Sequence, residues 1–305
     1  MRKLLFLFIF LFVTISIFGQ NTIEESSYVR QGRRFFDRRD YVSAISCFTD
    51  AVYENERDVD AFFYRGITYY AMGNYNEAIN DFNKLLRMNE IKAYQIYDAW
   101  MYRSKSYMKI GNYEKAIDDF TSIITFTMRN VVEAEFHDYE GIELYKELLN
   151  EILEDAYFNR GLCHVRIRMY QNAIYDYTIA INYNSENSIY FSNRGAAYSE
   201  VKDYENAERD LKKSLLLDPN QFEANHNLGI VYKDLEKYRD AVMVLTRAIE
   251  FNNNSASTYY WRGVAYYNLN DHRKAINDIE TAVRINPNNS HYRDALNMIR
   301  DVFYY

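Results

Sequence analysis

The sequence predicts an all-α solenoid of stacked helical hairpins, and three observations support this fold class. Glycines recur at a spacing of 34 residues: Gly32 and Gly66, then Gly161, Gly195, Gly229 and Gly263. An alanine follows each of these glycines at a fixed distance, as Ala78 follows Gly66. Only two prolines interrupt the 305 residues, and proline breaks helix interiors. A period of this length indicates an array of small helical units.

The period defines seven repeats, which are numbered by position from their first residues: Glu25, Val59, Tyr97, Glu154, Ser188, Phe222 and Ala256. In the second repeat, apolar residues at helical intervals predict a first helix before Gly73 and a second helix after it. Glycine at position 8, replaced by Ser104 in the third repeat, and alanine at position 20 allow the two helices to cross closely. One hairpin cannot bury its apolar face alone, so we expect the hairpins to stack.

These positions resemble the tetratricopeptide repeat, which has glycine at position 8, an aromatic residue at 11, alanine at 20 and proline near its end, as at Pro219 and Pro287. The resemblance covers about Glu25 to Asn289 and departs from the family at two positions. Position 4 is mostly Phe or Tyr instead of tryptophan, with Trp100 the one match, and position 7 is usually arginine instead of leucine. The resemblance implies a right-handed superhelical array whose inner groove binds a peptide or helix of a partner protein.

The N-terminal residues predict a secretory signal peptide over residues 1–19. Arg2 and Lys3 precede an apolar run, Leu4 to Phe18, and Gly19 supplies a small residue for cleavage. The alternative is an uncleaved membrane anchor, although a spanning helix needs about 20 apolar residues. We therefore expect an exported protein that is periplasmic, displayed at the cell surface or secreted, and that contacts a membrane only if the segment is retained.

Two segments interrupt the period. Four extra residues lie within 90–96, and twenty-three lie at about 130–153. The longer insert carries Ile142, Leu149 and Ile152 at helical intervals, which predicts a lengthened helix followed by an additional one. The end of the chain, with Tyr292, Leu296, Ile299 and Phe303 on one face, predicts a capping helix. The expected domains are the signal peptide 1–19, repeats one to three at 20–130, the insert 131–153, repeats four to seven at 154–289 and the cap 290–305.

Arginine at position 7 and aspartate at position 23 occur together in five repeats. The first and sixth repeats lack both residues. In an antiparallel hairpin these positions lie at similar heights, so we predict intra-repeat ion pairs that contribute to structure. The alternative is that the arginines line the groove and bind carboxylates or phosphates. The predicted pairs are Arg65–Asp81, Arg103–Asp119, Arg160–Asp176, Arg194–Asp210 and Arg262–Asp278.

The resemblance also implies that first-helix residues at positions 2, 5, 9 and 12 face the groove. In repeats two to four these are mainly apolar, which suits an adaptable peptide site. The alternative is that they pack against the next repeat or the inserted helix. The predicted partner-binding residues are Phe63, Ile67, Tyr70, Met101, Lys105, Met108, Phe158 and Leu162.

No feature of the sequence predicts a catalytic residue, a cofactor or a metal site. The five histidines have no metal-binding spacing, and zinc-protease, nucleophile-elbow and phosphate-loop patterns are absent. With a net charge of −7, we interpret the chain as acidic and without a basic block. This interpretation argues against nucleic-acid binding, which needs clustered lysine and arginine. Cys47 and Cys163 lie three repeats apart, so we expect buried thiols and no disulfide.

We therefore expect a non-enzymatic scaffold that binds another protein or peptide. Two alternatives remain. One is a membrane-anchored architectural array. The other is a metal-binding protein or enzyme that uses an acidic cluster in the insert, where a hard cation could bind, although a solvated connector explains the same residues. That cluster comprises Glu133, Glu135, His137, Asp138 and Glu140.

Overall fold

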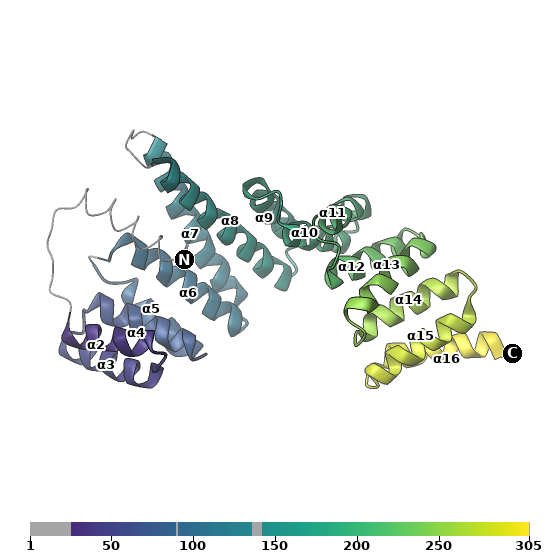
Figure 1. Ribbon diagram of the computed structural model, residues 1–305, viewed down its shortest axis with the longest axis horizontal. Coiled ribbons are helices and arrows are strands. Elements are labelled where there is room, and N and C mark those ends of the chain that lie inside the picture. Colours follow the sequence, from purple (N-terminus) through teal and green to yellow (C-terminus); the bar gives the residue numbers. More distant parts are fainter. Residues whose placement is uncertain (1–25, 90, 136–141, 305) are drawn as a thin grey trace. The chain divides into compact units, whose positions relative to one another are not determined.

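The computed structural model describes residues 26–89, 91–135 and 142–304, over which the chain forms fifteen α-helices and no β-strand (Figure 1). The expected signal peptide lies outside these residues. The helices are α2 (Ser27–Asp37), α3 (Tyr41–Glu54), α4 (Val59–Ala71), α5 (Tyr75–Leu85), α6 (Ala93–Lys109), α7 (Tyr113–Glu135), α8 (Ile142–Arg166), α9 (Tyr170–Tyr183), α10 (Ser188–Glu200), α11 (Tyr204–Leu217), α12 (Phe222–Asp234), α13 (Tyr238–Phe251), α14 (Ala256–Asn268), α15 (His272–Ile285) and α16 (Ser290–Tyr304).

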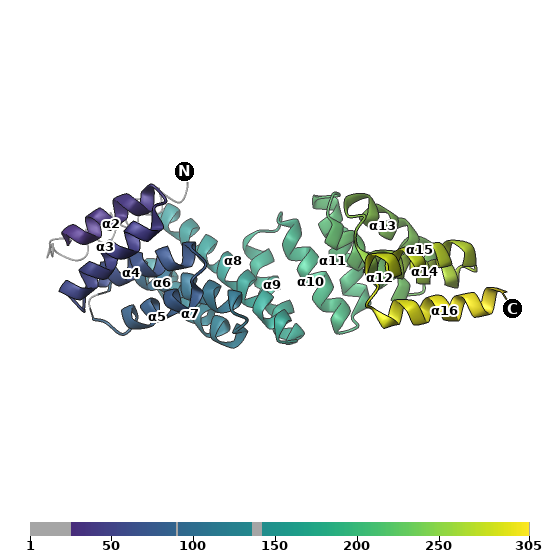
Figure 2. The same cartoon turned by 90° about the horizontal axis from the view of Figure 1, so that it is seen from below.

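The helices group into two compact units, each of which is a stack of hairpins. The first unit ends at Arg168 and holds α2 to α8, and the second begins at Met169 and holds α9 to α16. Within each unit every helix packs on the next one along the chain, as Figures 1 and 2 show. The predicted all-α solenoid of stacked helical hairpins is therefore confirmed in both units.

The two helices of a hairpin join through a tight turn with a left-handed residue at position 15. In the fifth repeat this residue is Lys202, whose N–H donates to Ser199 O at 3.0 Å, while the N–H of Asp203 donates to Tyr198 O at 2.9 Å. This pair of bonds is a Schellman motif, in which a left-handed residue ends the helix. Only two of the seven turns place glycine there. The left-handed residues are Arg39, Gly73, Gly111, Arg168, Lys202, Glu236 and Asn270.

Glycine at position 8 is required by the close crossing of the two helices. A Cβ on Gly66 would lie 2.9 Å from the ring of Phe82, and a Cβ on Gly229 would lie 2.4 Å from Leu245 Cγ. Both distances are shorter than real packing allows, so the expected role of this glycine is confirmed. The partner residue at position 24 is fully buried in both hairpins. This contact is the centre of each hairpin's core.

The long insert forms part of two helices instead of a separate one. Helix α7 is lengthened to 23 residues, as expected, but α8 runs for 25 residues from the insert through the first helix of the fourth repeat. No glycine or proline occurs between residues 142 and 160 to interrupt it. Helix α8 packs along α7, with Leu149 and Ile152 buried. The first compact unit consequently includes α8 and ends at Arg168, whereas the expected domains have their limits at residues 130 and 153.

The last helix, α16, closes the second unit as the expected cap. Its residues Tyr292, Leu296 and Ile299 are buried in a cluster with Tyr260 and Ile279. Its opposite side is exposed and mainly polar, with Met298 the exposed apolar residue among those described. Phe303, also expected on the buried face, lies outside the residues whose side chains the structure describes.

Two further expectations concern the cysteines and the membrane. Cys47 and Cys163 are both buried and form no disulfide, as predicted. Among the helices that the structure describes, none has both the length and the apolar character needed to cross a bilayer.

Candidate functional site

Four of the predicted Arg–Asp pairs lie within the described parts of single units, and all four form. In each, the arginine Nε donates to one carboxylate oxygen and Nη2 to the other, so the contact is bidentate. The fifth pair, Arg160–Asp176, would join the two units and stays a prediction. The two distances are 2.8 and 2.8 Å for Arg65–Asp81, 2.9 and 2.5 Å for Arg103–Asp119, 2.6 and 2.9 Å for Arg194–Asp210, and 2.7 and 2.8 Å for Arg262–Asp278.

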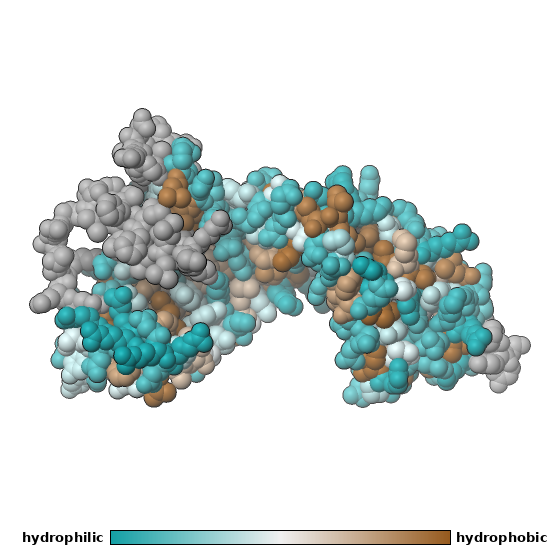
Figure 3. Space-filling view, in the orientation of Figure 1, coloured by the Kyte–Doolittle hydropathy of each residue, from teal (hydrophilic) through white to brown (hydrophobic). Residues whose placement is uncertain are grey.

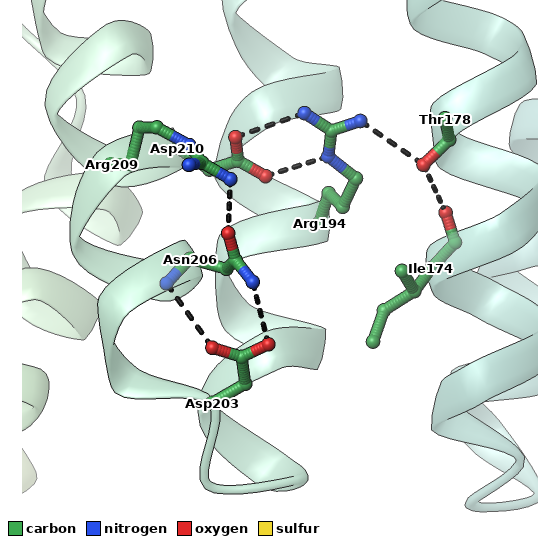
Figure 4. Close-up of polar contacts among 7 residues, drawn as sticks. All are labelled: Ile174, Thr178, Arg194, Asp203, Asn206, Arg209 and Asp210. Atoms are coloured by element: carbon green, nitrogen blue, oxygen red, sulfur yellow. Dashed lines mark hydrogen bonds and ion pairs between the residues drawn. The ribbon is translucent and has the colours of Figure 1, made fainter.

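The same arginines also bind the preceding repeat through their remaining nitrogen. Figure 4 shows Arg194 Nη1 donating to Thr178 Oγ1, at 3.0 Å, while Nε and Nη2 bind Asp210. Sequence reasoning missed this link, although a signal exists: threonine or asparagine stands at position 25 before every position-7 arginine, and Lys212 stands there before Leu228. The other links are Arg65–Thr49, Arg103–Asn83, Arg160–Thr121 and Arg262–Thr246.

Aromatic residues at positions 4 and 11 flank the guanidinium groups. The guanidinium carbon of Arg262 lies 5.6 Å from the ring centroid of Tyr259 and 5.9 Å from that of Tyr266, within the range of cation–π attraction. These rings therefore add to the contacts that hold the position-7 arginine. The first repeat keeps the rings, as Tyr28 and Phe35, but has Gln31 at position 7.

Electrostatic interactions favour the charged form of Arg65 and Arg262. Burial acts to lower the pKa of Arg262, but the hydrogen bonds and charge of Asp278 outweigh it and raise the pKa above its ordinary value. Arg65 shows the same balance with Asp81. Because Nε, Nη1 and Nη2 all have acceptors within the protein, the geometry disfavours an anion-binding role for these arginines.

The predicted groove residues divide into buried and half-exposed sets. Phe63 and Met101 are 3% and 6% exposed, so they are packing residues in this structure and offer no surface to a partner. This corrects their assignment as contact residues and agrees with the alternative that such side chains pack internally. The half-exposed set comprises Ile67 and Tyr70 of α4, Lys105 and Met108 of α6, and Phe158 and Leu162 of α8.

The four-residue insert before the third repeat covers part of Phe63, a position that is also buried at Ser192 and Tyr260. It adds a turn to the start of α6, and this turn places Tyr94 edge-on to Phe63, with ring centroids 6.1 Å apart. The next residue, Gln95, is fully buried and donates to Asp60 Oδ1 at 2.6 Å. Burial is also the main cause of a raised Tyr94 pKa. Positions 2 and 5 of the second repeat, Asp60 and Phe63, are thus covered by the chain itself.

The positions beyond this extra turn stay available in the first unit. The ring of Tyr70 is held edge-on between Tyr75 and Tyr102, at centroid distances of 5.7 and 5.2 Å, so its orientation is fixed. Methionine at 108 is flexible and polarisable, and Lys105 carries a positive charge. The accessible side chains are therefore apolar or cationic.

In the second unit the equivalent positions are more polar. His226 Nδ1 lies 2.9 Å from Thr258 Oγ1, and burial lowers the pKa of His226, against the opposing effect of Glu223. Lys233 Nζ lies 4.6 Å from the ring centroid of Trp261. These contacts hold the polar groups in place.

No group of three or more potential metal ligands occurs among the residues that the structure describes. The acidic cluster Glu133–Glu140 lies outside the residues whose side chains are described, so a metal site there stays a hypothesis.

Comparison with known proteins supports the repeat assignment. Residues 65–128, 190–221, 231–270 and 256–289 match models described as tetratricopeptide repeats. The C-terminal part of a TPR repeat-containing protein from Cytophaga hutchinsonii is 18% identical, with a TM-score of 0.63, and the match covers 88% of this chain and 99% of that one. A tetratricopeptide repeat protein from Parabacteroides merdae is 16% identical, with a TM-score of 0.55 and coverage of 89% and 97%. At these identities the likeness concerns the fold. No curated protein matches the chain.

Proposed function

Because the chain is a tetratricopeptide repeat protein, we propose that it is an exported, non-enzymatic scaffold that binds a segment of another protein through its first helices. The fold itself supports a role in protein–protein interaction. One observation supports this location: the position-9 and position-12 side chains of α4 and α6 stay half-exposed, and Ile67 and Tyr70 of α4 pack against a buried cluster of the first unit.

The chemistry of these side chains suggests the kind of segment that binds. Ile67, Tyr70 and Met108 offer apolar surface, and an amphipathic helix or an extended strand presents apolar anchors at matching intervals. Lys105 adds a positive charge at position 9 of the third repeat, the position of Ile67 in the second. We expect a partner segment with apolar anchors and at least one acidic residue.

A photo-crosslinking amino acid at position 108 tests this location directly. The protein should crosslink to one partner in the native envelope or secretome, and Lys105→Glu should lower the yield. The matched controls are a crosslinker at Tyr53, which is 89% exposed on α3, and Arg87→Glu, which makes the same charge change elsewhere. Equal crosslinking from positions 53 and 108 would contradict the proposal.

Two measurements separate this function from its alternatives. N-terminal sequencing of the mature protein should begin near Gln20 if the apolar run is a cleaved signal peptide, and at residue 1 or 2 if it is an anchor. Metal analysis of the purified chain should find no stoichiometric metal. Bound metal that disappears when Glu133 and Glu135 are changed to glutamine would instead favour a metal site in the insert.

A further inference from the structure

The N-terminal helix α2 and the turn after it carry a cluster of arginines. Residues 30–39 contain five arginines and one aspartate, Asp37, although the whole chain has a net charge of −7. The arginines are Arg30, Arg33, Arg34, Arg38 and Arg39, and all five are exposed. This local cluster corrects the interpretation of the chain as lacking a basic block, because the overall charge conceals it.

One row of these arginines lies on the side of α2 that faces away from the core. Val29 and Gly32 are the buried residues of this helix, which packs on α3 and α4. Arg30, Arg34 and Arg38 follow at intervals of four and so lie along one side. The surface over α2 is correspondingly hydrophilic in Figure 3. The first helix of the stack therefore presents an exposed, positively charged side.

Helix α8, the last helix of the first unit, carries a row of carboxylates at the same spacing. Residues 142–159 contain five carboxylates and one basic residue, Lys146, which binds Glu143 at 3.5 Å. Four of the carboxylates are exposed and follow at intervals of four residues: Glu143, Glu147, Glu151 and Asp155. This row is the acidic counterpart of the arginine row on α2.

The two rows match in spacing and in inclination. A helix rises about 1.5 Å per residue, so both rows carry a charge about every 6 Å. Rows spaced by four residues have the same inclination on every α-helix, and two such rows run parallel where the helices cross at about −50°. Three guanidinium groups on one helix can therefore face three carboxylates on the other. Each such contact can be bidentate, which adds specificity.

The two rows do not neutralise each other within one chain. Helix α2 begins the stack of the first unit and α8 ends it (Figure 1). In the part of the chain that the structure describes, Arg34 and Arg38 form no ion pair. Within the same described residues, Glu147 and Glu151 also form none. Opposite charges at matched spacing are thus exposed at the two ends of one unit.

We propose that the arginine side of α2 binds the carboxylate side of α8 in a second copy of this chain. Charge complementarity selects this partner, because the chain itself supplies an acidic helix with the spacing that the arginines require. Lipid head groups or nucleic acid would satisfy the arginines but would not account for the matching row on α8. Each copy has one side of each kind, so every molecule can make the contact twice.

Sedimentation velocity of the full chain over a range of concentrations tests this inference. The native chain should associate, and its association should weaken as salt screens the charges. Arg34→Glu with Arg38→Glu should weaken the association by about tenfold or more, because two attractive contacts become repulsive. Glu147→Arg with Glu151→Arg should weaken it to the same extent.

Mixing the two double variants distinguishes a direct contact from a general effect of charge. Neither variant should associate alone at the concentrations used. An equimolar mixture should associate, because each altered side then meets a side of opposite charge on the other variant. The quadruple variant, in which both rows are reversed, should associate as well. Recovery in either case also shows that the substitutions leave the chain folded.

The matched control reverses the same amount of charge in the second unit. Arg239→Glu with Arg273→Glu alters two exposed arginines at the starts of α13 and α15 and should leave the association nearly unchanged. Equal loss in this control, or no recovery in the mixture, would overturn the inference. A native chain that stays monomeric at every concentration would also overturn it, in favour of a different anionic partner. The predicted groove residues stay unchanged in every variant, so these outcomes are independent of the proposed scaffold function.

Discussion

The Arg194–Asp210 pair in the fifth repeat can be tested with a substitution that the chain itself provides. At the same two positions the sixth repeat has Leu228 and Val244, and both are buried. Three variants follow: Arg194→Leu, Asp210→Val and the double change. Thr178, which loses its donor in the variants without Arg194, keeps its own hydrogen bond to Ile174 O.

The magnitudes follow from the burial of the pair. The Asp210 side chain is 3% exposed and that of Arg194 is 15% exposed. Removing either partner leaves the other charge without compensation in a site that water barely reaches, which lowers the free energy of unfolding by about 3–5 kcal/mol. Arg194→Leu should have the larger effect, because the carboxylate is more deeply buried. The double variant should stay within about 1 kcal/mol of the native chain, since apolar replacement of a buried pair is often neutral.

Urea unfolding followed by tryptophan fluorescence measures the free energy of unfolding of the second compact unit, which contains this pair. The chain has only two tryptophans, Trp100 in the first unit and Trp261 in the second. With Trp100→Phe in every background, the signal of Trp261 reports the second unit alone. A single variant that costs less than about 1 kcal/mol, or a double variant that costs the sum of the singles, would refute the buried-pair reasoning.

Three further predictions concern stability. Lys202→Gly should raise the free energy of unfolding by about 0.5–1 kcal/mol, because glycine relieves a left-handed turn residue, and a lower urea midpoint would contradict this. Gly229→Ala should lower it by about 1–3 kcal/mol through the clash with Leu245, and an unchanged midpoint would count against the close crossing. Burial lowers the pKa of His226 in the folded state, so the unfolded state binds the proton more tightly and stability should fall as the pH decreases below about 6.5. His226→Gln should remove that part of the pH dependence in urea titrations, and an identical slope in both proteins would argue against it.

The periodic part of the structure could be predicted from the sequence. The hairpins, the close crossing at Gly66 and the Arg–Asp pairs all follow from comparing positions within one repeat. Because the repeat occurs seven times, each position can be compared across seven copies, and the conclusion does not depend on any single residue. The two helices of a hairpin are also near in sequence, so their relative heights follow from helix geometry alone.

The features that the sequence did not predict lie where the 34-residue period is interrupted or where two repeats meet. The edge-on contact of Tyr94 with Phe63 comes from a four-residue insert without a counterpart in the other repeats, whereas position 5 is buried also at Ser192 and Tyr260. Likewise α8 continues through a predicted boundary because nothing in its sequence ends a helix there. The groove residues themselves could be assigned only by analogy, since a repeat position does not show what covers it.

One pair of neighbouring repeats lacks the arginine link to position 25. Between the fifth and sixth repeats Leu228 replaces the arginine, and the connection there includes an exposed salt bridge between Glu208 and Lys237 at 2.7 Å. Exposed ion pairs stabilise by only about 0–1 kcal/mol. In a linear array, cooperativity passes only through neighbours, and one buried cluster contains both Leu211 of α11 and Leu228 of α12, so apolar packing spans this junction. Amide hydrogen exchange should therefore show α11 and α12 opening with similar free energies, so that a local unfolding event crosses the missing link and spreads along the second unit.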